Sequence, residues 1–216
     1  MIRVVVVDDE ALVRSGIELI LRAAGDIDVV ATADGRDAMW EISLHRPDVV
    51  LLDIRMPGVD GLTILTEVRA LPDPPAVAML TTFDTDEHIA SALRTGAAGF
   101  LLKDTDPGQL ARAVRALAGG AVVLSPSAAR LVGDSAGVSR AEAAARIGRL
   151  SEWERHVLTL VAEGASNDDI ALGLALSVHA VTEQVKAILG KLMVNSRMQA
   201  ALLAQAAGLL DEASGP

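Results

Sequence analysis

Short apolar runs alternate with amphipathic stretches through the first 119 residues of the chain. The runs consist mostly of Val, Leu and Ile, and three are nearly continuous, as expected for strands that are buried on both faces. They lie at residues 2–7, 27–31, 48–52, 76–80 and 99–102. The segments between them have the spacing of amphipathic helices. Five repeats of strand and helix predict an α/β domain over residues 1–119, with a doubly wound parallel sheet covered by helices on both faces.

The rest of the chain has a different pattern. Gly, Ser and Ala are frequent in residues 120–147, which we expect to form a linker with one short helix near residues 128–132. Residues 148–210 show helical periodicity only, and residues 211–216 form a short tail. Helix-capping residues predict four helices, which is typical of an all-α helix-turn-helix domain. These helices are expected to begin after Ser151, Ser166, Ser177 and Ser196.

Composition narrows the class of protein further. The 216 residues include no cysteine, which excludes a disulfide scaffold, a cysteine-ligated zinc site and a cysteine nucleophile. The formal net charge of −10 argues against strong non-specific attraction to nucleic acid or to anionic lipid. No apolar run approaches the roughly 18 residues that a membrane span needs, so we expect a cytoplasmic protein that does not bind membranes.

Polar side chains follow the predicted strands of the first domain. They are Asp8 and Asp9 after the first strand, Asp53 after the third, Thr81 after the fourth and Lys103 after the fifth. Because the carboxyl ends of parallel strands meet at one edge of a doubly wound sheet, these side chains should converge. Carboxylates so close together repel one another unless a hard divalent cation lies among them, and oxygen ligands favour Mg²⁺.

This set of residues predicts phosphoryl chemistry. Asp53 stands alone after the central strand and is the best candidate to attack phosphorus and form an aspartyl phosphate. Lys103 would neutralise one phosphoryl oxygen, and the Thr81 hydroxyl would donate to another. The sequence has no glycine-rich nucleotide loop and no convincing Ser–His–Asp spacing. We therefore expect no enzyme activity beyond self-phosphorylation and hydrolysis of the aspartyl phosphate.

Four motifs in residues 1–119 resemble those of the receiver domains of two-component response regulators. They are Asp8-Asp9, the stretch from Asp53 to Gly61, Leu80-Thr81-Thr82-Phe83, and Gly99-Phe100-Leu101-Leu102-Lys103-Asp104. The resemblance implies a five-stranded parallel sheet in the order 2-1-3-4-5. It also implies that a sensor histidine kinase phosphorylates Asp53. The implied magnesium ligands are Asp8 (partly through water), Asp9, Asp53 and the backbone carbonyl of Arg55.

The resemblance also assigns a switch and a control of phosphate lifetime. Thr81 and Phe100 match the switch pair of receivers, in which the hydroxyl moves toward the phosphate and the ring turns inward. Receivers tune the lifetime of the phosphate two residues after the aspartate and two after the threonine, here Arg55 and Phe83. Since Phe83 cannot orient a hydrolytic water by hydrogen bonding, we expect a long-lived aspartyl phosphate.

Residues 148–210 resemble the LuxR-type helix-turn-helix of the NarL/FixJ response regulators. The match rests mostly on buried or capping positions, which specify the fold rather than DNA binding. Among them are Leu160, Ile170, Val181, Val185 and Leu192. The resemblance implies a transcription regulator that forms a homodimer on phosphorylation and binds double-stranded DNA, with an inverted repeat as the expected site.

Polar side chains on and around the third helix of this region are candidate DNA contacts. They are Asn167, His179, Thr182, Glu183, Gln184, Lys186 and Lys191. The family usually has Lys and His where this chain has Thr182 and Gln184, and Glu183 adds a negative charge. From residue 148 onward the chain has five basic and eight acidic side chains, whereas DNA-binding domains are usually basic. A second hypothesis therefore stays open, in which this domain has weak or lost DNA binding and is a phosphorylation-switched protein-interaction domain.

Apolar side chains on three helices are candidate dimer contacts. In the first domain they lie on the first and fifth helices, and in the helical domain on the last helix. They are Leu12, Leu110, Val114, Leu117, Met198 and Leu202. The alternative for each is a place in the core of its own domain.

Overall fold

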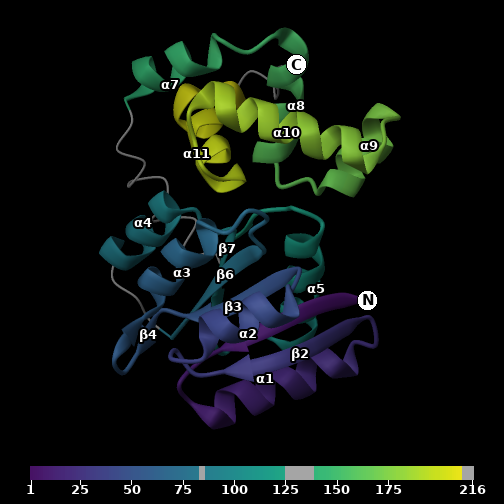
Figure 1. The fold of residues 1–216 in the computed structure, drawn as a ribbon. Coiled ribbons are helices and arrows are strands. Elements are labelled where there is room, and N and C mark those ends of the chain that lie inside the picture. Colours follow the sequence, from purple (N-terminus) through teal and green to yellow (C-terminus); the bar gives the residue numbers. More distant parts are fainter. Residues whose placement is uncertain (83–85, 125–138, 211–216) are drawn as a thin grey trace.

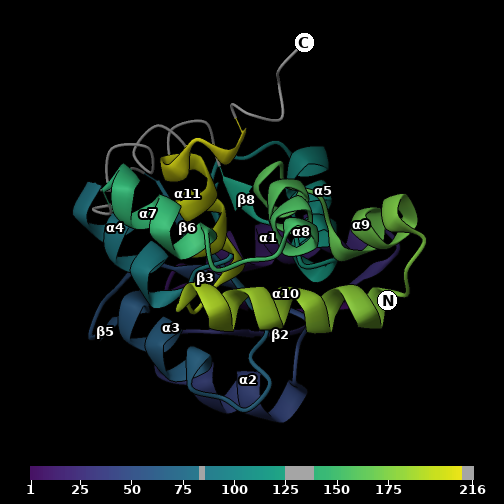
Figure 2. The same ribbon diagram turned by 90° about the horizontal axis from the view of Figure 1, so that it is seen from above.

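The computed structural model describes residues 1–82, 86–124 and 139–210. The chain forms an α/β domain followed by a helical domain (Figure 1). The helical domain lies over one end of the α/β domain, as Figure 2 shows from above. This architecture agrees with the predicted fold class.

Six parallel strands form the sheet of the α/β domain. In spatial order they are β2 (Ile27–Ala33), β1 (Ile2–Val7), β3 (Val49–Asp53), β6 (Ala76–Thr81), β7 (Gly99–Leu102) and β8 (Val123–Leu124). The first five confirm the predicted order 2-1-3-4-5. The sixth strand, β8, was not predicted, because two residues are too few to show a periodic pattern. A small antiparallel hairpin of β4 (Arg55–Met56) and β5 (Val59–Asp60) follows β3.

Five helices cover the two faces of this sheet. They are α1 (Ala11–Ala23), α2 (Ala38–His45), α3 (Gly61–Arg69), α4 (Asp86–Thr95) and α5 (Pro107–Ala118). Helices α1 and α5 contribute to the core on one face, and α2, α3 and α4 contribute to the core on the other. All five residues of β3 are buried, which explains why its apolar run shows no alternation.

Helix α5 does not present the predicted dimer surface. Leu110, Val114 and Leu117 are 4%, 0% and 1% exposed and belong to the core that α5 shares with α1 and the sheet. The prediction that these three side chains contact a second copy was wrong, because the apolar stripe of α5 is the face that covers the sheet. Leu12 of α1 is 86% exposed and remains a candidate contact.

Five helices are described in the helical domain. They are α7 (Arg140–Ile147), α8 (Glu152–Ala162), α9 (Asn167–Leu174), α10 (Val178–Leu192) and α11 (Arg197–Ala207). The last four confirm the predicted helices and begin at the predicted caps. Each capping hydroxyl accepts a hydrogen bond from the backbone N–H three residues later. The caps are Ser151, Ser166, Ser177 and Ser196.

Helix α7 lies in the segment that we predicted to be linker. Ala143 and Ile147 are 0% and 5% exposed and pack in the core of the helical domain. The linker prediction for residues 120–147 was therefore wrong over the residues of α7, which form part of the folded helical domain. The short helix predicted near residues 128–132 lies outside the described residues.

No single helix within the described ranges is both long and apolar enough to cross a membrane. One pair, α9 and α10, reaches the required length and composition together, and it is bent by 110° at its break. In the helical domain both helices contribute buried side chains, including Ile170 and Val181.

Helix α11 packs its apolar side chains against the α/β domain. Met198 is 1% exposed and belongs to the apolar core that also contains residues of α3 and α4, and Leu202 packs against that core. The prediction that these two side chains contact a second copy does not hold in this arrangement, because the α/β domain already covers them.

Polar contacts accompany this apolar contact between the domains. The Gln199 side-chain amide donates to the carbonyls of Leu93 and Arg94 near the end of α4, at 3.2 and 2.6 Å. The Arg69 guanidinium of α3 donates to the carbonyl of Asn195 at 2.7 Å. Helix α11 and the residues just before it are therefore tied to α3 and α4.

Candidate functional site

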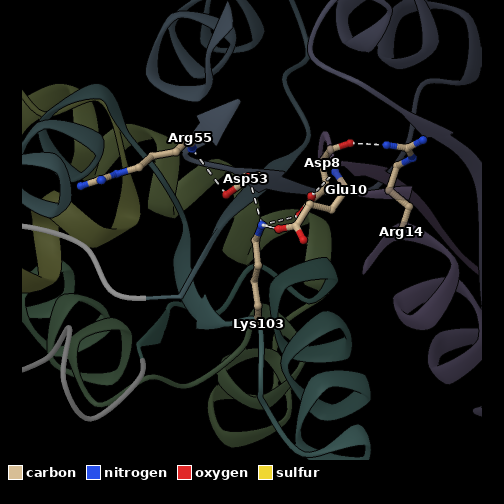
Figure 3. A network of polar contacts seen from close by, with 6 residues as sticks. All are labelled: Asp8, Glu10, Arg14, Asp53, Arg55 and Lys103. Carbon is tan, nitrogen blue, oxygen red and sulfur yellow. Dashed lines mark hydrogen bonds and ion pairs between the residues drawn. The ribbon is translucent and has the colours of Figure 1, made fainter. Parts of the chain in front are cut away.

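The five predicted site residues lie at one edge of the sheet, where the strands end. They are Asp8 and Asp9 after β1, Asp53 at the end of β3, Thr81 at the end of β6 and Lys103 after β7. Parallel pairing of neighbouring strands brings residues together that are up to 95 positions apart in the sequence. Figure 3 shows Lys103 reaching between the carboxylates of Asp8 and Asp53.

Lys103 is the cation of this site. Its Nζ lies 2.9 Å from an oxygen of Asp8 and 3.0 Å from an oxygen of Asp53. Burial disfavours the charged ammonium, but the hydrogen bonds and charges of the two carboxylates outweigh it and raise the pKa of Lys103 above 10.5. Lys103 is therefore fully charged at neutral pH.

Asp53 is a buried carboxylate, and Lys103 offsets only part of the free-energy cost of its burial. It is 4% exposed, and burial raises its pKa above the ordinary 3.8, with Lys103 partly opposing this shift. The backbone N–H of Arg55 donates to its Oδ1 at 3.4 Å, whereas the Arg55 side chain points away from Lys103 (Figure 3). A group that brings positive charge to Asp53 would relieve the cost of its burial.

Asp8, Asp9 and Asp53 fit a divalent cation. One carboxylate oxygen from each lies within 4.8 Å of the other two. The Oδ1 of Asp8 accepts a hydrogen bond from the backbone N–H of Glu10 at 2.9 Å, while its buried Oδ2 lies 2.9 Å from Lys103 Nζ. Such an oxygen is a suitable ligand for a hard cation such as Mg²⁺. The fourth predicted ligand, the Arg55 carbonyl, stays a prediction.

The two residues of the predicted switch pair are both buried. Thr81 is 6% exposed, and its carbonyl accepts a hydrogen bond from the backbone N–H of Lys103 at 2.8 Å. Phe100 is 0% exposed and packs in the same apolar core as Met198. The ring is thus turned inward in this structure. Phe83 lies outside the described residues, and the long phosphate lifetime stays a prediction.

Two site residues were missed in the sequence. An oxygen of the Glu10 carboxylate lies 3.5 Å from Lys103 Nζ, and the Arg14 guanidinium donates to the carbonyl of Asp8 at 2.5 Å. Both stand within six residues of the Asp8-Asp9 pair, which was the available signal. Their contacts depend on the distant Lys103 and on the backbone path after β1, which the local sequence does not show.

The candidate DNA-contact residues of α10 form a mixed surface. His179, Glu183 and Lys186 are exposed, while Thr182 and Gln184 are half-buried. Lys186 Nζ lies 3.1 Å from the carboxylate of Glu183, in an exposed ion pair within the helix.

Two other candidate DNA contacts have partners inside the protein. Asn167 donates its backbone N–H to the carbonyl of Gly119 in the α/β domain at 2.8 Å, and its side chain donates to Thr182 at 3.1 Å. Lys191 pairs with the nearly buried Glu154 of α8 at 2.6 Å. In this structure Lys191 therefore has a structural role, and Asn167 faces the α/β domain.

Comparison with known proteins agrees with this division of the chain. A family model described as response regulator receiver domain matches residues 4–115, and one described as bacterial regulatory proteins, luxR family, matches residues 149–204. The chain is 40% identical over 211 residues to the "Probable transcriptional regulatory protein NarL" of Mycobacterium tuberculosis, which covers 97% of this chain and 96% of that protein.

Two solved structures extend the comparison over nearly the whole chain. The response regulator ChrA of a heme-sensing two-component system is 35% identical, with a TM-score of 0.53 and coverage of 94% of this chain and 96% of that one. A structure of two RcsB dimers bound to two parallel DNAs is 25% identical, with a TM-score of 0.55 and coverage of 95% and 98%.

Proposed function

This chain belongs to the two-component response regulators of the NarL/FixJ type, and we propose that a sensor histidine kinase phosphorylates it on Asp53. A receiver domain joined to a LuxR-type DNA-binding domain makes it a regulator of transcription. The observation that supports the phosphorylation site is the position of the Asp53 carboxylate, 3.0 Å from Lys103 and within reach of Asp8 and Asp9.

The proposed step is transfer of a phosphoryl group to Asp53. One carboxylate oxygen forms a bond to phosphorus while the bond between phosphorus and the kinase histidine nitrogen breaks. Lys103 would turn from Asp53 to a phosphoryl oxygen, and the Thr81 hydroxyl would donate to another. Asp8, Asp9, Asp53 and the Arg55 carbonyl would hold Mg²⁺, which when bound supplies positive charge against the phosphoryl oxygens. We propose no catalysis beyond this self-phosphorylation and the hydrolysis of its product.

The proposed output is phosphorylation-dependent binding of a homodimer to an inverted repeat in double-stranded DNA. The RcsB structure, which consists of two dimers bound to two parallel DNAs, supports this assembly as a proposal for the present chain. The exposed Leu12 on α1 can contact a second copy directly. Met198 and Leu202 could do so only after α11 leaves the receiver domain. The proposal places the protein in the bacterial cytoplasm, beside the kinase and the chromosome.

One observation favours a second candidate function. Lys186 and Lys191, the two lysines of α10, both pair with glutamates of the same domain. Each pairing reduces the charge available to DNA phosphates, which supply most of the affinity in non-specific binding. The helical domain could then act as a phosphorylation-switched protein-interaction domain.

Genome-wide DNA selection with the purified protein, with and without acetyl phosphate and Mg²⁺, separates the two functions. We expect an enriched inverted repeat that strengthens with phosphorylation and disappears in Asp53→Ala. The Lys186→Ala variant should bind the same repeat more weakly. No enrichment in either state, from folded protein that incorporates phosphate, would contradict DNA binding and favour the protein-interaction function.

A further inference from the structure

Glu10 has an unusual position beside the phosphorylation site. It occupies the N-cap position of α1, but its side chain caps no backbone N–H of that helix. Instead its carboxylate lies 3.5 Å from Lys103 Nζ. The Glu10 side chain is 61% exposed, whereas that of Lys103 is 10% exposed. Glu10 thus places one negative charge at the solvent side of Lys103, and Figure 3 shows the two side chains next to each other.

The backbone of Glu10 is held independently of its side chain. Its N–H donates to Asp8 Oδ1 at 2.9 Å, and the Arg14 guanidinium one turn later donates to the carbonyl of Asp8. The carboxylate therefore contributes charge to the pocket without supporting the loop or the start of α1. A change of this side chain should leave the local structure intact.

The Glu10 carboxylate acts on an incoming phosphodonor in two ways. It competes for Lys103, which a phosphoryl oxygen must also engage, and it repels the donor's negative charge. A phosphohistidine is delivered by a protein whose other contacts supply binding energy, whereas a free small phosphodonor lacks such contacts. The repulsion by Glu10 therefore weakens the binding mainly of small anionic donors, and this effect grows with the charge of the donor.

We propose that Glu10 is a specificity-determining residue that disfavours small, highly charged phosphodonors at Asp53. This inference rests on the proposed function, because it assumes that Asp53 accepts phosphate. With acetyl phosphate, a dianion at neutral pH, an Asp53 oxygen bonds to phosphorus as the bond to acetate breaks, and acetate leaves with the electron pair. With phosphoramidate, a monoanion whose nitrogen is protonated, the leaving group is ammonia.

The test compares Glu10→Gln with the wild type in initial rates of phosphorylation by these two donors at a fixed Mg²⁺ concentration. The ratio of kcat/KM for acetyl phosphate to that for phosphoramidate should rise about threefold, as expected for one unit of charge at several ångströms in a solvent-exposed site. The change should appear mainly in KM and should shrink in high salt.

Two variants serve as matched controls. Glu10→Asp keeps the charge and should retain most of the wild-type preference. Glu18→Gln removes one charge from the same helix at a residue that pairs with Arg22, and should leave the donor ratio unchanged. Equal thermal midpoints of all variants should confirm that the fold is intact.

The outcomes distinguish this inference from the proposed function. An unchanged donor ratio in Glu10→Gln, or an equal ratio change in Glu18→Gln, would overturn the role of Glu10. A wild-type protein that takes no phosphate from either donor, or whose labelling persists in Asp53→Ala, would overturn Asp53 as the phosphoacceptor.

Discussion

At the scale of single residues, Lys103 is the cation that balances the buried carboxylates of Asp8 and Asp53. Folding raises the pKa of Lys103 above 10.5. This stabilisation is therefore fully present below pH 10.5 and is lost as the pH rises through the pKa of Lys103 in the folded state. At pH 7 we expect Lys103→Met to lower the free energy of unfolding by about 3 kcal/mol, because two carboxylates remain buried without a counter-charge. Urea unfolding followed by circular dichroism measures this change.

Added Mg²⁺ should recover part of the stability lost in Lys103→Met, since it would supply positive charge to the same carboxylates. The control is Lys186→Met, which replaces an exposed lysine. It should change the free energy of unfolding by no more than about 0.5 kcal/mol. Equal destabilisation in the two variants would show that Lys103 does not balance buried charge.

The ion pair of Glu154 and Lys191 predicts a pH dependence at the same scale. The hydrogen bond from Lys191 is the main reason why the pKa of Glu154 lies below 4.5, with the backbone N–H of Ser151 adding to it. A carboxylate whose pKa is lowered on folding stabilises the protein at pH values above its unfolded-state pKa. This contribution is lost as the pH falls through its folded-state pKa. Lys191→Met should therefore cost about 1 kcal/mol or less near pH 7, and the difference from the wild type should narrow toward about pH 4.

Unfolding of both proteins in urea across this pH range provides the test of the Glu154 prediction. The difference between the two proteins isolates this pair from the other carboxylates, which titrate in both. A difference that stays constant or grows on acidification would contradict the assigned role of Lys191.

At the scale of elements, α1 and α5 show how an apolar stripe can be interpreted in two ways. Leu110 is 4% exposed and Leu12 is 86% exposed, although both were candidates for a dimer contact. We expect Leu110→Ala to lower the free energy of unfolding by about 3 kcal/mol by creating a cavity, and Leu12→Ala to change it by less than about 0.5 kcal/mol. Analytical ultracentrifugation of the phosphorylated proteins should show weaker dimers for Leu12→Ala only. Loss of stability in Leu12→Ala would argue against its exposure.

The elements were predictable where the local pattern was strong. The buried strands and the Ser-capped helices α8 to α11 follow from periodicity and capping alone. Helix α7 was missed although Ser139 accepts a hydrogen bond from the N–H of Glu142, and this Ser-x-x-Glu spacing is a start signal. Its Ala-rich composition resembles a linker, and its short apolar face, with Ala143 and Ile147, gains stability only against the other helices.

At the scale of the whole molecule, the sequence predicted the site far better than the contact between domains. Asp8, Asp53 and Lys103 converge because parallel strands share an edge, which is a rule of the fold. The domain contact follows no such rule, since Gln199 reaches backbone carbonyls more than 100 residues away, and any residue supplies a carbonyl. Glu10 escaped notice for a related reason, because its partner Lys103 comes from another strand.

The polar contacts between domains lead to a prediction about the whole molecule. Gln199 donates to two carbonyls at the end of α4, and Arg69 donates to the carbonyl of Asn195. Each substituted residue should contribute roughly 1 kcal/mol, so the double variant Arg69→Ala, Gln199→Ala should shift the balance toward separated domains by up to about 30-fold. Small-angle X-ray scattering should then give a larger radius of gyration. The control is Gln205→Ala, which changes an exposed residue of α11 and should match the wild type. If the double variant stays as compact as the wild type, the remaining contacts are sufficient to hold the domains together, namely the apolar packing of Met198 and Leu202 and the hydrogen bond from the Asn167 N–H to the Gly119 carbonyl.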